Sequence, residues 1–235
     1  MSSLIFRQLY ECESCTYTYL LGDSKSREAI LIDPVRETVE RDLKLLGELG
    51  LKLKFILDTH IHADHVTGAS ALRERTGAKT AVSSLAKVDC ADLSLSEGDE
   101  ISWGPFRLKA IATPGHTDSC MSYFGEGMVF TGDSLMIRGT GRTDFQQGSS
   151  DRLFDSITLK LFKLPPDTRV YPAHDYKGIM SSTIGEEMKH NPRVGGGRSR
   201  EEFAKIMSEL KLTQPKKIHE ALPANLACGR GSGKI

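Results

Sequence analysis

The sequence lacks any run of apolar residues approaching the roughly 20 that a bilayer crossing needs, so it predicts no membrane span. It also lacks a surplus of either charge, because 31 Lys and Arg residues balance 31 Asp and Glu residues. A chain without net charge offers no electrostatic reason to bind nucleic acid or an anionic membrane. Residues 1–7 resemble neither a signal peptide nor an Arg-rich transit segment. We therefore expect a cytoplasmic protein, or a mitochondrial matrix protein if a eukaryotic transit peptide has been removed.

Cysteine is also scarce, with five residues scattered along the chain. The odd number and the scatter argue against a disulfide framework and for a reducing compartment. Cys12 and Cys15 form one Cys-x-x-Cys pair, but a zinc ribbon needs a second such pair. A thioredoxin-like motif needs a helix directly after the pair, whereas residues 16–20 are typical of a strand. We expect both residues to be ordinary buried or half-buried thiols.

What the sequence does contain is a regular succession of strand and helix patterns. Short runs rich in β-branched or aromatic residues predict strands, and apolar residues at helical spacing predict helices. The expected strands are residues 4–9, 15–21, 29–33, 53–57, 80–83 and 169–173, with β-hairpins at 101–112 and 121–131. The expected helices are residues 35–49, 67–76 and 151–164, the last with Ser150 as N-cap, and two more near the C-terminus. The second of these two opens with a capping box at residues 199–202.

These patterns predict one domain, residues 1–235, because no long linker or internal repeat divides the chain. Sheets with one apolar face must bury that face. We therefore expect an α+β fold in which two mostly antiparallel sheets pack face to face with helices outside. Residues of metal-binding type follow several of the strands, so several strand ends should meet at one edge of this sandwich.

The densest group of such residues lies at residues 58–65, directly after the apolar run 53–57. Neutral imidazole and carboxylate groups bind zinc, iron and other transition metals. His60 and His62 are two residues apart, so an extended backbone directs both to one side. Asp64 and His65 follow where the chain turns. Three later segments with a strand pattern also end in residues of this kind, namely His116, Asp133 and His174.

Together these motifs resemble the metallo-β-lactamase superfamily and, within it, the persulfide dioxygenases, also called sulfur dioxygenases. The resemblance is carried by residues 58–68, 115–117, 130–139, 141–148, 171–178, 191–193 and 223–225. The histidine cluster specifies the superfamily, whereas residues 141–148 and 173–178 are more selective. Ile61, Asp118 and Thr140 depart from the family pattern without touching its metal ligands. The resemblance implies an αββα sandwich with a metal site at one edge.

The resemblance further implies one Fe(II) per chain, with His60, His116 and Asp133 as both its ligands and the catalytic residues. Two histidines and one carboxylate leave three positions on a non-haem iron for substrate and O2. Zinc has no redox chemistry and could not serve. The implied reaction belongs to sulfide catabolism and oxidises glutathione persulfide with O2 to sulfite and glutathione.

Other side chains receive implied roles around the metal. Those expected to form hydrogen bonds around the ion without binding it are His62, Asp64, His65 and His174. Those expected to bind glutathione are Arg142, Tyr176 and Lys177. An arginine can pair a carboxylate through two hydrogen bonds, whereas a lysine acts as a point charge. The alternatives are a structural role for Arg142 in a glycine-rich loop and a solvated surface position for Lys177.

Several alternatives stay open at this level. The residues around the iron could ligate a second metal, as in a binuclear hydroxyacylglutathione hydrolase of the glyoxalase II type, which would activate a bridging water. A non-catalytic metal or sulfide sensor is a further alternative. A homodimer, and a rhodanese-like sulfurtransferase that supplies substrate, rest on analogy. We expect Asp144 and Asp175 to brace loops and Cys120 to pack in the core.

Overall fold

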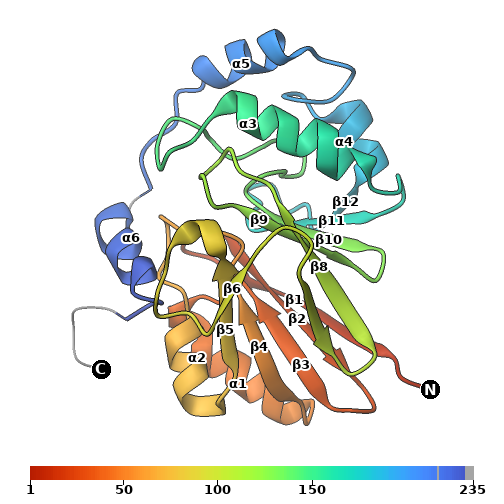
Figure 1. Ribbon diagram of the computed structural model, residues 1–235, viewed down its shortest axis with the longest axis vertical. Helices are drawn as coiled ribbons and strands as arrows, with labels where there is room; N and C mark the ends of the chain where they lie inside the picture. Colours follow the sequence, from red (N-terminus) through yellow and green to blue (C-terminus); the bar gives the residue numbers. More distant parts are fainter. Residues whose placement is uncertain (216, 231–235) are drawn as a thin grey trace.

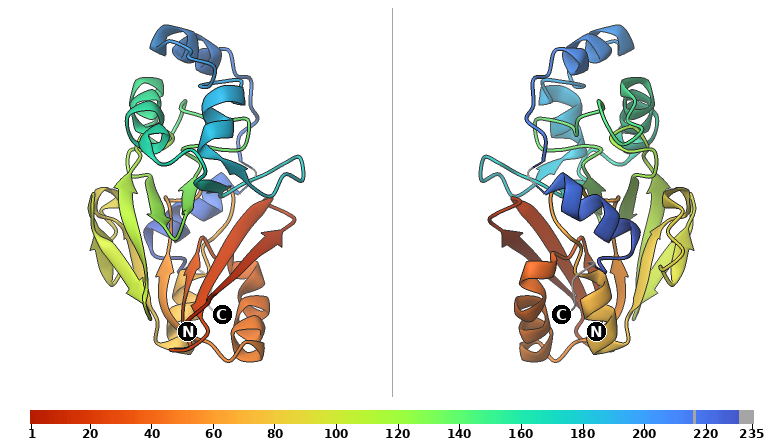
Figure 2. Two further views of the ribbon diagram at one scale, coloured as in Figure 1. Left: turned by 90° about the vertical axis from the view of Figure 1, so that its right-hand side faces the viewer. Right: turned by 90° about the vertical axis from the view of Figure 1, so that its left-hand side faces the viewer.

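The computed structural model describes residues 1–215 and 217–230. Two six-stranded sheets pack face to face, and helices cover their outer faces (Figure 1). The layers are seen from the sides in Figure 2. The predicted αββα sandwich is thereby confirmed. The predicted domain, residues 1–235, also includes residues 216 and 231–235, which lie outside the described part. Among the described residues, no helix combines the length and apolarity that a membrane crossing requires.

The first sheet has the strand order β1-β2-β3-β4-β5-β6. Its first three strands pair antiparallel, whereas β3 to β6 pair parallel. Parallel neighbours need a crossover, and helices α1 (Val39–Glu48) and α2 (Ala69–Thr76) provide two of them. Mostly antiparallel pairing therefore does not extend to this half of the sheet. The strands are β1 Leu4–Glu11, β2 Thr16–Asp23, β3 Glu28–Ile32, β4 Lys52–Leu57, β5 Lys79–Ser83 and β6 Leu93–Leu95.

The second sheet has the order β12-β11-β10-β9-β8-β7. Its pairs are antiparallel except for the parallel pair of β10 and β11. Both predicted hairpins are present, as β7–β8 and β9–β10. The strands are β7 Glu100–Trp103, β8 Phe106–Ala112, β9 Met121–Gly125, β10 Met128–Gly132, β11 Arg169–Pro172 and β12 Ser182–Thr183.

The core lies between the two sheets, and its largest side chains are fully buried aromatics: Tyr19, Trp103, Tyr123 and Phe130. Helices α1 and α2 pack on the outer face of the first sheet. Helices α3 (Ser150–Asp155), α4 (Ile184–His190) and α5 (Arg200–Ser208) cover the outer face of the second (Figure 1). The predicted capping box opens α5, where Ser199 and Glu202 exchange hydrogen bonds with each other's backbone amides.

The helix predicted at residues 151–164 is shorter than expected. Helix α3 ends at Asp155 and continues as a π-helical turn, Ser156–Lys160, and a 3-10 turn, Leu161–Lys163. The Ser156 hydroxyl donates to the Pro114 carbonyl at 2.7 Å, and the Thr158 hydroxyl donates to the Phe154 carbonyl at 2.7 Å. Such hydroxyl bonds to backbone carbonyls compete with regular helix bonding.

Three elements were not predicted from the sequence, namely β6, β12 and helix α6 (Ile218–Leu226). The two strands are too brief to show alternation. Helix α6 contains Pro223, which sequence rules treat as a helix breaker. The helix predicted at residues 35–49 begins with a 3-10 turn at Arg36–Thr38, and α1 starts after it.

The expectation for the cysteines is wrong in two respects. Cys90 and Cys228 form a disulfide, with their Cα atoms 6.0 Å apart across a sequence separation of 138 residues. Cys12 is exposed instead of buried, whereas Cys15 is half-buried as expected. A separation of this size gives no local pattern that could predict the pairing.

The N-cap of α3 is Ser149, and the predicted cap Ser150 is the first helical residue. The Ser149 hydroxyl accepts a hydrogen bond from the Arg152 amide at 3.3 Å. We expect Ser149→Ala to lower the free energy of unfolding by about 1 kcal/mol. The matched variant Ser150→Ala should change it by less than about 0.5 kcal/mol. Urea denaturation of the two variants measures the difference, and equal effects would contradict the assignment of the cap.

Candidate metal centre

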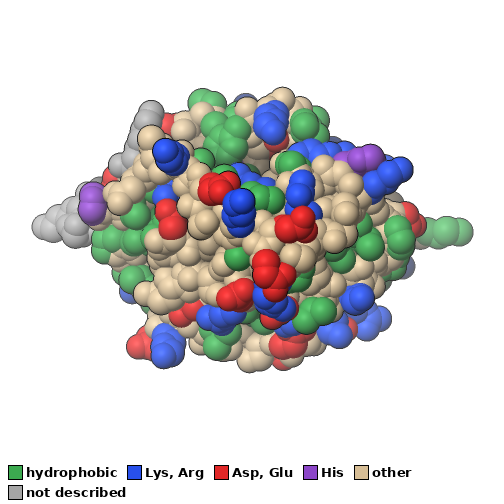
Figure 3. Space-filling view, turned by 90° about the horizontal axis from the view of Figure 1, so that it is seen from above, with side chains coloured by type: hydrophobic (Ala, Val, Ile, Leu, Met, Phe, Trp, Pro, Cys, Tyr) green, Lys and Arg blue, Asp and Glu red, His purple; other side chains and the backbone are tan. Residues whose placement is uncertain are grey.

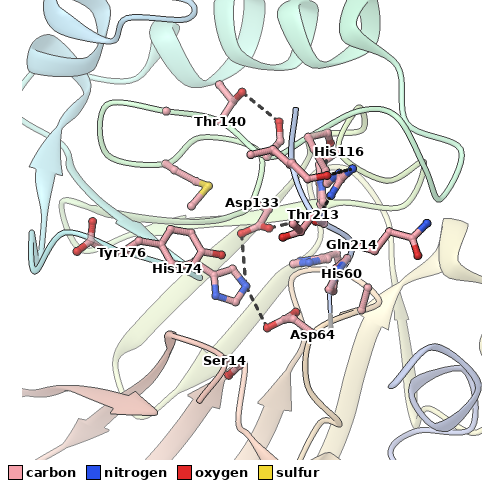
Figure 4. Close-up of a pocket in the computed structure, with 18 of the residues that line it drawn as sticks. Ser14, His60, Asp64, His116, Asp133, Thr140, His174, Tyr176, Thr213 and Gln214 are labelled. Atoms are coloured by element: carbon pink, nitrogen blue, oxygen red, sulfur yellow. Dashed lines mark hydrogen bonds and ion pairs between the residues drawn. The ribbon is translucent and has the colours of Figure 1, made fainter. Parts of the chain in front are cut away.

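The predicted site residues lie on loops at one edge of the sandwich. The histidine loop, defined as residues 58–68, follows β4 and carries four of them. His116 follows β8, Asp133 follows β10 and His174 follows β11. Since β4 belongs to the first sheet and the others to the second, the site lies where the ends of both sheets meet. Figure 4 shows Asp133 between His116 and His174, with His60 beside them.

His60, His116 and Asp133 form a group whose metal-binding atoms all lie within 4.8 Å of one another. The Nε2 atom of His116 lies 3.6 Å from Oδ2 of Asp133. Burial lowers the pKa of His60 well below its usual value, and the neighbouring imidazoles of His62 and His116 lower it further. Neutral imidazole is the metal-binding form. The structure therefore brings the three predicted ligands together in a group that could hold an ion.

Hydrogen bonds determine which nitrogen of each histidine is free. Thr59 Oγ1 donates to Asp33 at 2.9 Å, so it can only accept from Nδ1–H of His60, 3.0 Å away. The carbonyl oxygen of Arg142 accepts from Nδ1–H of His116 at 2.8 Å. In both rings the lone pair is then on Nε2. Oriented imidazoles of this kind are typical of metal ligands.

Asp33 is a site residue that the sequence patterns did not single out. It follows β3, is buried and has a φ of 52°. It accepts hydrogen bonds from the Thr59 amide at 2.7 Å and from His62 Nε2 at 3.1 Å. Burial alone would lower the pKa of His62, but the Asp33 carboxylate raises it to about 9. Asp33 thus engages Nε2 of His62, which forms possible metal-binding groups both with Asp33 and Asp58 and with Asp64 and His65. The available signal was the position of Asp33 at a strand end, like that of the other site residues.

The remaining predicted residues form a second group around Asp64. His65 Nδ1–H donates to Asp64 Oδ2 at 3.0 Å, and His174 Nε2 lies 3.5 Å from the same oxygen. His174 Nε2 also lies 3.8 Å from Asp133 Oδ1 (Figure 4). The three side chains thus contact one another beside the metal-binding group, and their role without direct metal ligation stays a prediction. Within the described part of the chain, three buried atoms of the site lack a hydrogen-bond partner, namely His62 Nδ1, His65 Nε2 and Asp133 Oδ1.

Asn225 on helix α6 supports the histidine loop from outside. Its side-chain amide donates to the carbonyl oxygens of His62 and His65, at 2.8 Å each. Its Oδ1 accepts from the Thr67 amide at 2.8 Å. Asn225 belongs to the motifs that carry the family resemblance. Its role could not be predicted from the sequence, because no local pattern shows which loop α6 contacts.

A cavity of about 480 Å³ opens over the metal-binding group. Arg142, Tyr176 and Lys177, the predicted glutathione contacts, all line it. Arg142 is already engaged, since it makes two 2.6 Å hydrogen bonds to Asp144 and donates to the Thr213 carbonyl at 2.7 Å. Tyr176 is 68% exposed, and its ring stacks on that of His174.

Arg193 also lines this cavity, although the sequence analysis gave it no site role. It donates to the Thr140 carbonyl at 2.5 Å. Burial lowers its pKa, and no carboxylate of the described residues pairs with it. A half-buried arginine without a counter-charge is well suited to pair a ligand carboxylate.

The smaller expectations also have structural outcomes. Asp144 holds Arg142, and Asp175 accepts from the amides of Lys177 and Ile179 at 3.0 and 2.7 Å, so both brace loops as predicted. Cys120 is buried, which raises the pKa of its thiol to about 11. A packing role for Cys120 is confirmed.

Comparison with known proteins agrees with this geometry. A model of the metallo-beta-lactamase superfamily matches residues 16–174. The mitochondrial persulfide dioxygenase ETHE1 of Mus musculus is 50% identical over 229 residues, covering 96% of this chain and 89% of its own length. The chain belongs to the persulfide dioxygenase family of the metallo-β-lactamase superfamily.

A solved structure and a comparison with a related hydrolase agree with this assignment. The crystal structure of ETHE1 from Myxococcus xanthus superposes with a TM-score of 0.94 at 54% identity, covering 96% of this chain and all of the other. A hydroxyacylglutathione hydrolase of Brucella anthropi is 39% identical over 170 residues, covering 70% of this chain and 63% of its own length. The sequence identity to the persulfide dioxygenases is thus higher and extends over more residues.

The role of Thr59 in this persulfide dioxygenase can be tested by substitution. Thr59→Val keeps the shape of the side chain but removes the oxygen that accepts from His60 Nδ1–H. We expect ferrous ion to bind about 10- to 100-fold more weakly, as is usual when such a partner is lost. Competition with a chelator under anaerobic conditions measures the affinity. Thr59→Ser keeps the hydroxyl and serves as the control. Equal affinities for valine and serine variants would refute an orienting role.

Proposed function

We propose that the chain oxidises glutathione persulfide with O2, giving sulfite and glutathione, at a single Fe(II) in sulfide catabolism. The observation that carries this proposal is the group of His60, His116 and Asp133. Among the described residues, both imidazoles have Nδ1–H engaged and Nε2 free, and Asp133 Oδ1 is buried without a hydrogen-bond partner. Two imidazoles and one carboxylate suit a non-haem iron with open positions. The high identity to proteins named persulfide dioxygenases supports the same activity.

The donor set fits iron, and the residues around it define what the chain contributes. A ferrous ion in this group supplies the redox chemistry that joins O2 to sulfur. Thr59 and the Arg142 carbonyl hold the two imidazoles in place. His174, 3.8 Å from Asp133, supports the carboxylate from the opposite side. Phe145 packs edge to face on His116, with the ring centroids 6.1 Å apart.

The cavity also suits a peptide thiol with two carboxylates, such as glutathione. Arg193, which has no carboxylate partner among the described residues, lines this cavity together with Tyr176 and Lys177. We propose that all three contact glutathione. Arg142 remains a proposed contact, although Asp144 already occupies its two-pronged face. A carboxylate would meet Arg142 beside that existing pair.

A second function is favoured by one specific observation. Asp64, His65 and His174 lie together, and His65 Nε2 is buried without a hydrogen-bond partner among the described residues. A second ion bound there would suit a binuclear hydroxyacylglutathione hydrolase. Metal count and substrate therefore distinguish the two candidates.

The proposed activity predicts a specific pair of results. Protein purified anaerobically and loaded with ferrous ion should contain one iron per chain. On addition of glutathione persulfide it should consume O2 and release sulfite, as followed with an oxygen electrode and a sulfite assay. S-lactoylglutathione should not be cleaved. Two tightly bound metals together with thioester cleavage would establish the hydrolase instead.

The two arginines of the cavity give a further prediction. Arg193→Ala should raise KM for glutathione persulfide at least tenfold with little change in kcat, because a charge-assisted hydrogen bond is worth about 1.5–3 kcal/mol. Arg193→Lys keeps the charge and should recover part of the loss. Steady-state oxygen consumption measures both constants. An unchanged KM in Arg193→Ala would remove this residue from the substrate site.

The matched variant Arg142→Ala separates binding from structure. If Arg142 contacts glutathione, KM rises while iron content stays constant. Loss of iron together with activity shows instead that its side chain and carbonyl serve to position His116.

We also propose the remaining features from the sequence analysis. The chain would act in the cytoplasm, or in the mitochondrial matrix of a eukaryote, as a homodimer, with substrate supplied by a rhodanese-like sulfurtransferase. Nucleic acid and membranes would not be partners. On the face drawn in Figure 3, Lys and Arg side chains are interspersed with Asp and Glu. Light scattering of the purified protein tests the dimer.

A further inference from the structure

Helix α6 is the element that secures the histidine loop from outside. It lies beside the edge of the sandwich, against the first sheet (Figure 1), and is seen from both sides in Figure 2. Its Asn225 holds three backbone groups of the loop, the carbonyls of His62 and His65 and the amide of Thr67. A single side chain of α6 therefore restrains the backbone on the C-terminal side of the proposed ligand His60.

Apart from the three Asn225 hydrogen bonds, the non-covalent contacts of α6 mostly involve small or exposed side chains. Ala221 and Ala224 pack on Val66, and each alanine buries only a methyl group. The ion pair of Glu220 with Arg36 joins two side chains that are 58% and 37% exposed. Exposed pairs of this kind contribute little. These alanine contacts and this ion pair therefore contribute little to fixing the position of α6.

The disulfide of Cys90 and Cys228 supplies a covalent hold. Cys228 lies just after α6, and Cys90 lies in the loop that precedes β6. Cys228 is buried in one apolar cluster with Ile61, a residue of the histidine loop next to His60. The covalent bond thus joins α6 to the body of the sandwich at the point where the helix meets the metal-binding loop.

We propose that Cys90 and Cys228 form a redox-controlled clasp that sets the rigidity of the histidine loop and, through it, the retention of the metal. The clasp closes by exchange with a small disulfide such as glutathione disulfide. The Cys90 thiolate attacks one sulfur and releases one glutathione; the Cys228 thiolate then attacks the Cys90 sulfur and releases the second. Two electrons pass from the cysteine pair to the glutathione disulfide, and the two thiol protons leave with the two glutathione molecules.

Exposure determines where this exchange begins. Cys90 is half-buried, whereas Cys228 is only 7% exposed. An external disulfide or thiolate therefore reaches Cys90 first. The inference stands whether or not glutathione persulfide is the substrate, because loop rigidity and metal retention are measured without turnover.

The test compares oxidised and reduced protein by hydrogen exchange. Full-length protein is equilibrated with glutathione disulfide or with dithiothreitol, with and without bound ferrous ion. Peptide mass spectrometry should show Cys90 linked to Cys228 only in the oxidised sample. Amides of residues 61–68 should exchange about tenfold faster after reduction, because a restrained segment then opens more often. Release of ferrous ion to a chelator should accelerate in parallel.

Three variants complete the test. Cys90→Ser should show the fast exchange in both conditions, and Cys12→Ser, at an exposed cysteine outside the clasp, should behave as wild type. Asn225→Ala should show fast exchange even with the disulfide closed. Reduced wild-type protein gives the same comparison without a substitution if a variant fails to fold. Equal exchange over residues 61–68 in oxidised and reduced wild type, or no linked peptide after oxidation, would overturn the proposal.

Discussion

The carboxylate of Asp33 lies at the base of the metal centre, bonded to the chain that follows β4. It accepts from the Thr59 amide, the Thr59 hydroxyl and the His62 ring. Its left-handed backbone conformation costs about 1 kcal/mol or more in a non-glycine residue. Three hydrogen bonds hold it there. Through Thr59 this carboxylate orients His60, and through its direct bond it engages Nε2 of His62. One buried acid therefore distinguishes a proposed ligand from its near neighbour in sequence.

A comparable link joins the metal centre to the wall of the cavity. The carbonyl of Arg142 holds His116, while its guanidinium holds the backbone of the segment that crosses the cavity at Leu212 and Thr213. Asp144 keeps the guanidinium in place. A shift of this segment would thus be transmitted to His116 through a single residue. This connection links the proposed ligand His116 to the wall of the cavity.

The sequence predicted what is local and missed what is distant. Alternation and turn residues were enough for most strands, and ligand types at strand ends were enough for His60, His116, Asp133 and His174. Asp33 was not predicted, because it directly precedes Pro34 and aspartate is common in ordinary turns. Helix α6 was not predicted because Pro223 lies inside it. The Cys90–Cys228 disulfide was not predicted because the two residues are 138 positions apart. Each miss depends on which segments meet in the folded chain, and no pattern within one segment records that.

The contrast between the two histidine groups bears on the number of ions. At His60 and His116 neither Nε2 atom has a hydrogen bond within the described part of the chain, and that of His116 lies 3.6 Å from Asp133 Oδ2. In the second group, Asp64 Oδ2 already accepts hydrogen bonds from His65 Nδ1 at 3.0 Å and Thr16 Oγ1 at 3.4 Å. His174 Nε2 lies 3.5 Å from the same oxygen. An ion that took Asp64 Oδ2 as a ligand would have to replace the contacts that this oxygen already makes, although His65 Nε2 has no hydrogen-bond partner among the described residues. An ion in the first group displaces almost none. The difference favours a single iron in the first group, with the second group supporting Asp133 through His174.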